Sequence, residues 1–150
     1  MEYKRLNLGC GTELLDGYLN IDKERLFYQD NFMCLSLGNC TLPFENNSIE
    51  QVVSSHFLEH LDGEEIQHLI KELYRVCENG AIITFLCPYY KSPTAYRPFH
   101  QQYISETFFD DYKKMDPKKC KSADHKHWFK ITYDLFDDVV VLYLEVVKEK

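Results

Sequence analysis

The alternation of apolar and polar residues predicts a short strand near the start of the chain. Leu6 and Leu8 alternate with polar neighbours, which is the period of a β-strand. The strand runs into residues 9–11, Gly-Cys-Gly, where two glycines let the backbone turn sharply and let a ligand approach main-chain atoms. A strand followed by a glycine turn is the place at which open α/β sheets bind nucleotide-like ligands.

A second alternating stretch, residues 18–22, predicts another strand that ends at Asp22. Only residues 12–18 connect it to the first strand, whereas a parallel crossover normally takes about a dozen residues, usually helical. We therefore expect a loop or a single turn here, and a reduced form of a β-α-β fold. The free carboxylate of Asp22 ends its strand on the same crevice as the glycine turn, which makes it a candidate ligand-binding group.

The clearest helix is expected between residues 62 and 80. Asp62 and Glu65 form a capping-box pattern, and apolar residues then recur at helical spacing as far as Cys77. Gly80 is the expected stop signal. This apolar stripe predicts packing against a sheet.

Further strands are predicted on both sides of this helix. Residues 32–37 and 51–55 are expected to form the third and fourth strands. Residues 81–87 are almost all apolar, which is typical of a parallel strand that is covered on both faces. Residues 128–135 and 138–147 predict two final strands joined as a hairpin.

Length, charge and cysteine content narrow the class of protein. The 150 residues predict a single domain, residues 1–150, and the net charge of −7 makes unaided nucleic-acid binding unlikely as a function. No apolar run approaches the ~20 residues of a membrane span, and the start of the chain lacks the apolar core of a signal peptide. The six cysteines contain no C-x-x-C pair, which is typical of reduced thiols, so we expect a cytoplasmic protein.

Three segments resemble the class I methyltransferases that use S-adenosyl-L-methionine (SAM). Residues 5–13, RLNLGCGTE, resemble the family's first motif, and residues 42–61, LPFENNSIEQVVSSHFLEHL, resemble its step into the central fourth strand. Residues 98–108, PFHQQYISETF, resemble its proline-x-histidine block and the helix start that follows. The resemblance, which covers roughly residues 4–112, implies a Rossmann-like three-layer α/β sandwich. Its sheet would be mostly parallel, with an antiparallel C-terminal hairpin and fewer helices after the first strand.

The same resemblance implies a binding site for SAM, and for its product S-adenosyl-L-homocysteine (SAH). In the family, the acid that ends the second strand binds the two ribose hydroxyls, which assigns that role to Asp22. The cofactor-binding candidates are Leu8, Gly9, Cys10, Gly11, Asp22, Ser54, Ser55 and His56. The family usually places an acid after the third strand to meet the adenine amino group, but this sequence offers Ser36, Gly38 or Asn39 instead.

An aromatic-rich segment, residues 88–112, follows the fifth predicted strand and is the expected acceptor side. His100 is the first candidate for a general base, because histidine exchanges protons readily near neutral pH. Tyr89 and Tyr90 are candidates to orient the acceptor, which we expect to be a small molecule. The alternative is that these aromatic residues only cap the core.

Two other functions remain open at this point. A degenerate SAM-binding domain that acts as a partner subunit would fit the missing adenine-side acid. A nicotinamide-dependent oxidoreductase is disfavoured because Leu14 stands where a third glycine would be needed. No Gly-Lys-Ser/Thr ending is present, which excludes a P-loop.

Two further segments contain candidate binding sites. Residues 56–60 match the H-x-x-E-H pattern of inverted zinc proteases, but that chemistry needs one continuous helix and a third ligand, so no metal is expected. Lys113–Lys130 contains seven lysines against two aspartates, which suits a solvated loop or a contact with an acidic substrate or partner. Cys120, His125 and His127 lack a fourth ligand nearby and are discounted as a metal site.

Overall fold

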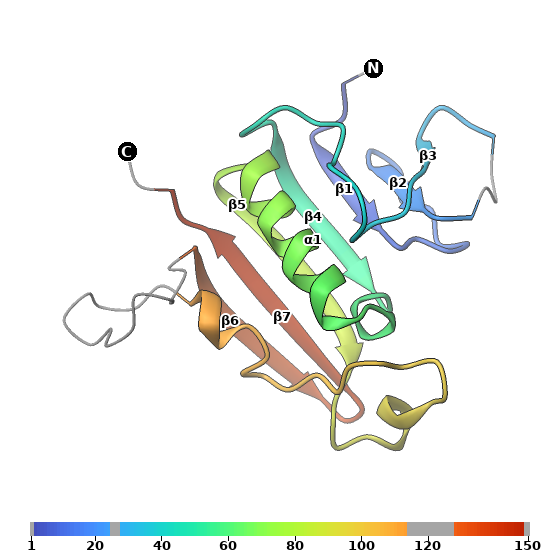
Figure 1. Ribbon diagram of the computed structural model, residues 1–150, viewed down its shortest axis with the longest axis vertical. Coiled ribbons are helices and arrows are strands. Elements are labelled where there is room, and N and C mark those ends of the chain that lie inside the picture. Colours follow the sequence, from blue (N-terminus) through green and yellow to red (C-terminus); the bar gives the residue numbers. More distant parts are fainter. Residues whose placement is uncertain (1, 25–27, 114–127, 149–150) are drawn as a thin grey trace.

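Seven strands form one sheet in the computed structural model, which describes residues 2–24, 28–113 and 128–148 (Figure 1). The strand order is β3-β2-β1-β4-β5-β7-β6, with β1 to β5 parallel and β7 antiparallel to both of its neighbours. This confirms the mostly parallel sheet with an antiparallel C-terminal hairpin. The strands are β1 (Arg5–Leu8), β2 (Leu19–Asp22), β3 (Phe32–Cys34), β4 (Ile49–Ser55), β5 (Cys77–Pro88), β6 (Phe129–Phe136) and β7 (Val139–Val146).

One α-helix, α1 (Gly63–Val76), lies across β4 and β5 on one face of the sheet (Figure 1). Its capping box is formed as expected, with the Asp62 carboxylate accepting the Glu65 amide at 2.8 Å and the Glu65 carboxylate accepting the Asp62 amide at 3.1 Å. Three short 3₁₀ turns are η1 (Leu58–His60), η2 (Pro93–Tyr96) and η3 (Asp110–Tyr112). Since α1 is the only α-helix in the described residues, the helical layers are reduced further than the family's three-layer sandwich implies.

The predicted bounds of three elements were wrong, and β5 is one of them, because it begins at Cys77 rather than at residue 81. The third strand stops at Cys34 rather than at residue 37, and α1 stops at Val76 rather than near Gly80. Residues 78–81 lie between the β4–β5 pairs Ile49–Cys77 and Gln51–Ile82, so β5 bulges here. Gly80 adopts a φ of +85° within this bulge, and therefore serves the strand instead of capping the helix.

The short β1–β2 connection is held by two buried asparagines instead of a helix. Asn7 and Asn20 are paired in the register of β1 and β2, and the Asn7 amide donates to Asn20 Oδ1 at 2.8 Å. Asn20 Oδ1 also accepts a hydrogen bond from the backbone amide of Leu15 at 2.9 Å. The side-chain amide of Asn7 donates a second hydrogen bond, to the carbonyl of Glu13, at 2.9 Å. These bonds fix the connection that begins with the glycine turn.

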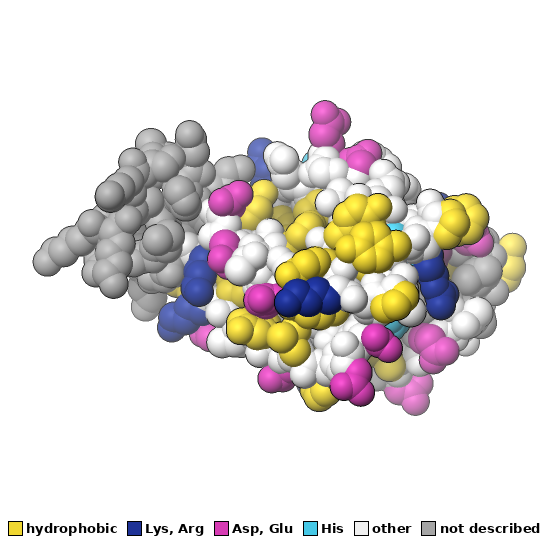
Figure 2. Space-filling view, turned by 90° about the horizontal axis from the view of Figure 1, so that it is seen from below, with side chains coloured by type: hydrophobic (Ala, Val, Ile, Leu, Met, Phe, Trp, Pro, Cys, Tyr) yellow, Lys and Arg dark blue, Asp and Glu magenta, His cyan; other side chains and the backbone are white. Residues whose placement is uncertain are grey.

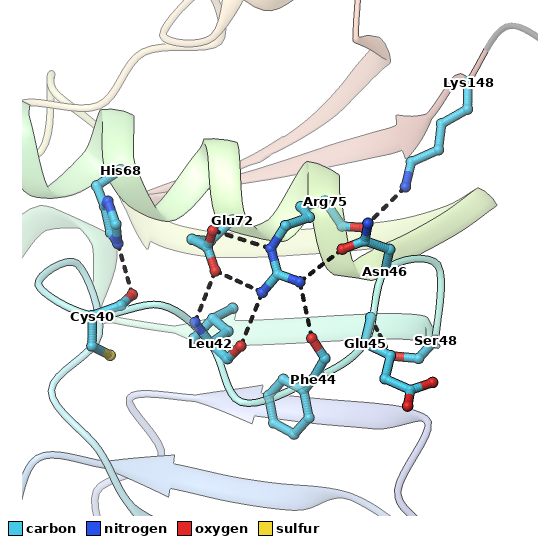
Figure 3. A network of polar contacts seen from close by, with 10 residues as sticks. All are labelled: Cys40, Leu42, Phe44, Glu45, Asn46, Ser48, His68, Glu72, Arg75 and Lys148. Atoms are coloured by element: carbon cyan, nitrogen blue, oxygen red, sulfur yellow. Dashed lines mark hydrogen bonds and ion pairs between the residues drawn. The ribbon is translucent and has the colours of Figure 1, made fainter.

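The β3–β4 connection is fixed by an ion pair on α1 (Figure 3). Arg75 donates to both oxygens of Glu72, at 3.2 and 2.8 Å, and to the carbonyls of Leu42 and Phe44, at 2.9 and 3.0 Å. Glu72 in turn accepts the Leu42 amide at 2.8 Å. The hydrogen bonds from Arg75 outweigh the cost of burial and hold the pKa of Glu72 below its ordinary value.

Candidate functional site

The first cavity, of about 550 Å³, opens at the carboxyl ends of the strands beside the glycine turn. Gly9, Gly11, Asp22 and His56, all predicted from the sequence, line it together with residues from the β3–β4 connection and from α1. The volume falls within the range of small-molecule and cofactor sites. The structure thus brings four of the eight predicted cofactor-binding residues to one cavity.

The two glycines of the turn have different roles. Both adopt left-handed backbone angles, with φ of +61° at Gly9 and +51° at Gly11. A Cβ atom on Gly9 would lie 2.2 Å from the ring of Phe57, so that position must be glycine for Phe57 to pack against the turn. A Cβ atom on Gly11 would meet nothing within 4 Å, so the main chain there stands beside open space.

Asp22 joins the glycine turn to the end of β2. Its Oδ2 accepts the backbone amide of Gly11 at 2.9 Å, and its Oδ1 accepts the amide of Glu24 at 3.1 Å. Each carboxylate oxygen has a second acceptor position, so both can still accept a hydroxyl. The arrangement suits a ligand with two neighbouring hydroxyl groups.

The remaining predicted cofactor-binding residues lie apart from this cavity's lining. Leu8 is fully buried, and Cys10 is 5% exposed, where burial raises the pKa of its thiol to about 11. Ser54 is buried and Ser55 is exposed at the end of β4. His56, the next residue, does reach the cavity because its left-handed backbone, with a φ of +52°, turns the chain out of the strand.

Glu65, which was not predicted as a site residue, lies near the β3–β4 connection, where the family usually has its adenine-side acid. Ser36 and Asn39 line the cavity, and so does Glu65 from the first turn of α1. Glu65 Oε1 accepts the Asp62 amide, while its Oε2 accepts the Asn39 amide at 3.4 Å. In the sequence, Glu65 is explained by its place in the capping box. Its place in the cavity depends on the β3–β4 connection, which lies next to it in the fold.

A second cavity, of about 490 Å³, adjoins the first. His56 and His60 line both cavities, which makes them part of the wall between the two. Glu59, Arg97 and His100 line the second cavity only. The candidate base His100 therefore lies in a cavity next to the predicted cofactor site.

Tyr89 and Tyr90 are not among the residues lining either cavity. Their rings pack edge to face with centroids 4.9 Å apart. A hydrogen bond to the Glu106 carboxylate and, to a smaller extent, desolvation raise the pKa of Tyr89 to about 12. The structure thus separates these two candidates from His100.

Three other aromatic side chains of the β5–β6 connection are exposed, whereas Phe109 is buried in the core. Phe99 lines the second cavity yet is 81% exposed, and Tyr96 and Tyr103, at 58% and 53%, pack against each other with centroids 4.8 Å apart. Viewed from below, the molecule shows hydrophobic side chains gathered at this end among charged ones (Figure 2). Most of this aromatic surface is thus neither core nor cavity.

Glu59 is the most deeply buried charged side chain near the two cavities, at 1% exposure. Within the described part of the chain, no N–H or O–H group donates a hydrogen bond to either carboxylate oxygen. His56 Nδ1 and His60 Nε2 lie 3.9 and 3.8 Å from Oε1. Burial, the charge of Glu59 and a hydrogen bond from the thiol to Glu59 raise the pKa of the neighbouring Cys87 thiol well above its ordinary value, so that thiol stays protonated. The weak S–H donor of Cys87 is thus the group that faces the Glu59 carboxylate from β5.

Two predictions fall partly or wholly outside the described residues. Most of Lys113–Lys130 is not described, so the suggested acidic substrate or partner stays a prediction, as does the discounted metal site at Cys120, His125 and His127. Within the described residues, no helix has the length and apolar character needed to cross a membrane.

Comparison with known proteins agrees with this geometry. A SAM-dependent methyltransferase from Archaeoglobus fulgidus has a TM-score of 0.66 at 13% identity, over 96% of this chain and 88% of its own. The DhpI–SAH complex has a TM-score of 0.67 at 13% identity, over 97% and 77%. A chain of the complex that contains the Haloferax volcanii Trm112 methyltransferase activator has a TM-score of 0.65 at 12% identity, over 98% and 84%.

Sequence comparison adds the family. A search of curated protein sequences found no match. A family model described as a methyltransferase domain matches residues 6–85, which is more than half of the chain and includes the glycine turn, Asp22 and most of β5. The chain therefore belongs to the methyltransferase-domain family.

Proposed function

We propose that this protein binds SAM in the first cavity and transfers its methyl group to a small-molecule acceptor in the second. The main observation behind the proposal is that the two cavities share a wall. His56 and His60 line both cavities, so a ligand in each would meet at these two residues. Holding two reactants in contact supplies much of the rate enhancement of a displacement reaction.

The residues of the first cavity fit the cofactor. Asp22 has acceptor positions left for the two ribose hydroxyls, and the main chain at Gly11 stands beside open space. Ser36, Asn39 and Glu65 offer polar contacts for the adenine in place of the family's acid. SAM, when bound, supplies a methyl group that is already activated by a sulfonium.

The second cavity offers a proton acceptor and orienting groups. The Nδ1 of His100 lies 3.1 Å from the carbonyl of Ala95, which can only accept, so the ring proton belongs on Nδ1. Nε2 is then free to take a proton from the acceptor. Thr94 and Arg97 line the cavity, and we assign them the orienting role first considered for Tyr89 and Tyr90.

A second candidate is a SAM-binding domain that works as a partner subunit without turnover. It is favoured by the absence of an acid directly after β3, where the family usually has one. The similarity to a chain from a complex with a methyltransferase activator supports a protein partner for either candidate. Cofactor binding is common to both candidates, whereas SAH formation belongs only to the first.

Titration calorimetry with SAM, SAH and NAD⁺ is the first test, and we expect SAM and SAH to bind with one site each. SAH release is then measured with a low-molecular-mass metabolite fraction, and with RNA and protein fractions for comparison. We expect release with the metabolites, and a ~10²–10⁴-fold slower release by His100→Ala at nearly unchanged SAM affinity. Binding of NAD⁺ but not SAM would refute the proposal, and SAM binding without release in any fraction would favour the partner subunit.

A further inference from the structure

We propose that Glu59, His60 and His100 bind a divalent transition-metal ion in the second cavity, beside the wall that it shares with the first. One ligand atom from each of these side chains lies within 4.8 Å of the others. The sequence pattern argued against a metal because the H-x-x-E-H segment lacks a third ligand. The fold supplies that ligand from the β5–β6 connection.

The chemistry of the three groups calls for a cation. The Nδ1 atoms of His60 and His100 lie 3.2 and 3.1 Å from the carbonyls of Phe99 and Ala95, so both carry their ring protons there. The Nε2 atoms of the neutral rings are then acceptors, and the carboxylate of Glu59 is an acceptor as well. Two acceptor nitrogens then lie beside a buried carboxylate that receives no hydrogen bond from an N–H or O–H of the described residues, and only the weak S–H donor of Cys87 faces it. A positive ion between these three groups would stabilise them.

The two histidines are held as metal-binding histidines usually are. A hydrogen bond from the second ring nitrogen to a backbone carbonyl fixes the tautomer and the orientation of a liganding imidazole. The segment after His100 is also tied to η1, because the Gln101 amide donates to the Glu59 carbonyl at 2.8 Å and the Gln101 side chain donates to the His60 carbonyl at 3.0 Å. The ligands thus come from two segments that are hydrogen-bonded to each other.

Two nitrogens and one carboxylate oxygen are the donor set of catalytic zinc sites, which keep one position open. Ligand atoms around a tetrahedral zinc are about 3.4 Å apart, given bonds of about 2.0–2.1 Å. Glu59 Oε1 and His60 Nε2, at 3.8 Å, are already near that separation, and the ligand atom of His100, within 4.8 Å of the other two, would have to move closer. The open position would face the second cavity, which all three side chains line.

Metal binding does not depend on methyl transfer, but it bears on the reaction. An ion on Nε2 of His100 takes the atom that a general base would use, and instead lowers the pKa of a hydroxyl acceptor bound at the open position. The two roles of His100 are therefore alternatives, and a metal titration separates them without any methyl acceptor.

The test uses the full chain without a histidine tag, dialysed against a chelator and titrated with CoCl₂ and ZnCl₂ by calorimetry and visible absorption. We expect one equivalent of Co²⁺, with d–d absorption and no thiolate charge-transfer band. Glu59→Gln and His100→Gln should each weaken binding about tenfold or more. The matched control is His68→Ala, which removes a histidine that is bonded to the Cys40 carbonyl in the β3–β4 connection and lines neither cavity.

Circular dichroism and thermal unfolding check that each variant is folded, and only folded variants are compared. No stoichiometric binding by the wild type would overturn the proposal. So would equal affinity in the wild type and His100→Gln, or binding that is lost in Cys120→Ala but kept in His100→Gln.

Discussion

The backbone amide of Gly11 donates a 2.9 Å hydrogen bond to Oδ2 of Asp22, and so couples the glycine turn after β1 to the acid that ends β2. The turn and the acid were each predicted from a different stretch of the sequence. Their contact means that Asp22 both positions the turn and has acceptor positions left for a ligand. A change at Asp22 should therefore affect the glycine turn as well as the contact with a ligand.

Asp22→Asn should weaken SAM binding. The change removes the charge that strengthens hydrogen bonds to ribose hydroxyls and to the Gly11 amide, each worth about 1.5–3 kcal/mol. We expect the Kd to rise about 10–150-fold in titration calorimetry. Asp16→Asn, on the exposed part of the β1–β2 connection, is the control and should bind as the wild type does. Equal affinity of Asp22→Asn and the wild type would remove Asp22 from the site.

Gly9→Ala should destabilise the protein more than Gly17→Ala does. Both positions have left-handed backbones, with φ of +61° and +82°, so both changes cost about 1–2 kcal/mol of strain. Only at Gly9 does the new methyl group overlap a neighbour, the ring of Phe57, which adds about 1–3 kcal/mol. Urea unfolding measures the difference. When Phe57 is already alanine, adding Gly9→Ala should cost only the backbone strain, without the added overlap. Equal losses of stability in Gly9→Ala and Gly17→Ala would contradict the packing argument.

Asn20→Ala should lower the free energy of unfolding by about 2–4 kcal/mol. It removes the acceptor of the Leu15 backbone amide and one of the two acceptors of the Asn7 side-chain amide, and an unsatisfied buried donor costs about 1–3 kcal/mol. Asn7→Ala keeps the Asn20 bond to Leu15 and should cost less. Both are compared by urea unfolding. A greater loss from Asn7→Ala would mean that Asn20 is not the residue that holds the connection.

The sequence was most informative where local patterns determine local structure. The capping box at Asp62 and Glu65, the glycine turn, and the alternation in β1 and β2 each follow from neighbours in the chain, and the structure has all of them. The groups that line the cavities depend on contacts between distant segments. Glu65 is next to Asn39, and Glu59 is next to His100, only because the β3–β4 and β5–β6 connections fold back on the helical segment after β4.

A contact between distant segments also explains why the end of α1 was predicted wrongly. Glycine after an apolar helical stripe usually signals a C-terminus, and Cys77 continued the stripe by one more position. Pairing of Cys77 with Ile49 in the sheet overrides that local preference, and the glycine then serves the bulge. Sheet pairing is a long-range interaction, which periodicity within one segment does not report.

Glu72→Gln should remove an acid-sensitive part of the stability. Glutamine keeps the shape and still accepts the Leu42 amide, but it loses the charge that Arg75 faces. The folded protein holds the pKa of Glu72 below its ordinary value of 4.5, so this pair stabilises the fold above about pH 4.5 and stops doing so as the pH falls through the lowered pKa. At pH 7 we expect the variant to be less stable by about 1.5–3 kcal/mol.

The difference between Glu72→Gln and the wild type should therefore narrow as the pH falls below about 4.5, because the wild type loses the ion pair that the variant never had. Urea unfolding at a series of pH values measures it. Glu64→Gln, exposed in the first turn of α1, is the matched control, and its difference from the wild type should stay small throughout. A gap between Glu72→Gln and the wild type that stays constant down to pH values where the wild type begins to unfold would mean that the charge of Glu72 contributes nothing. The β3–β4 connection would then depend on the hydrogen bonds from Arg75 to the carbonyls of Leu42 and Phe44.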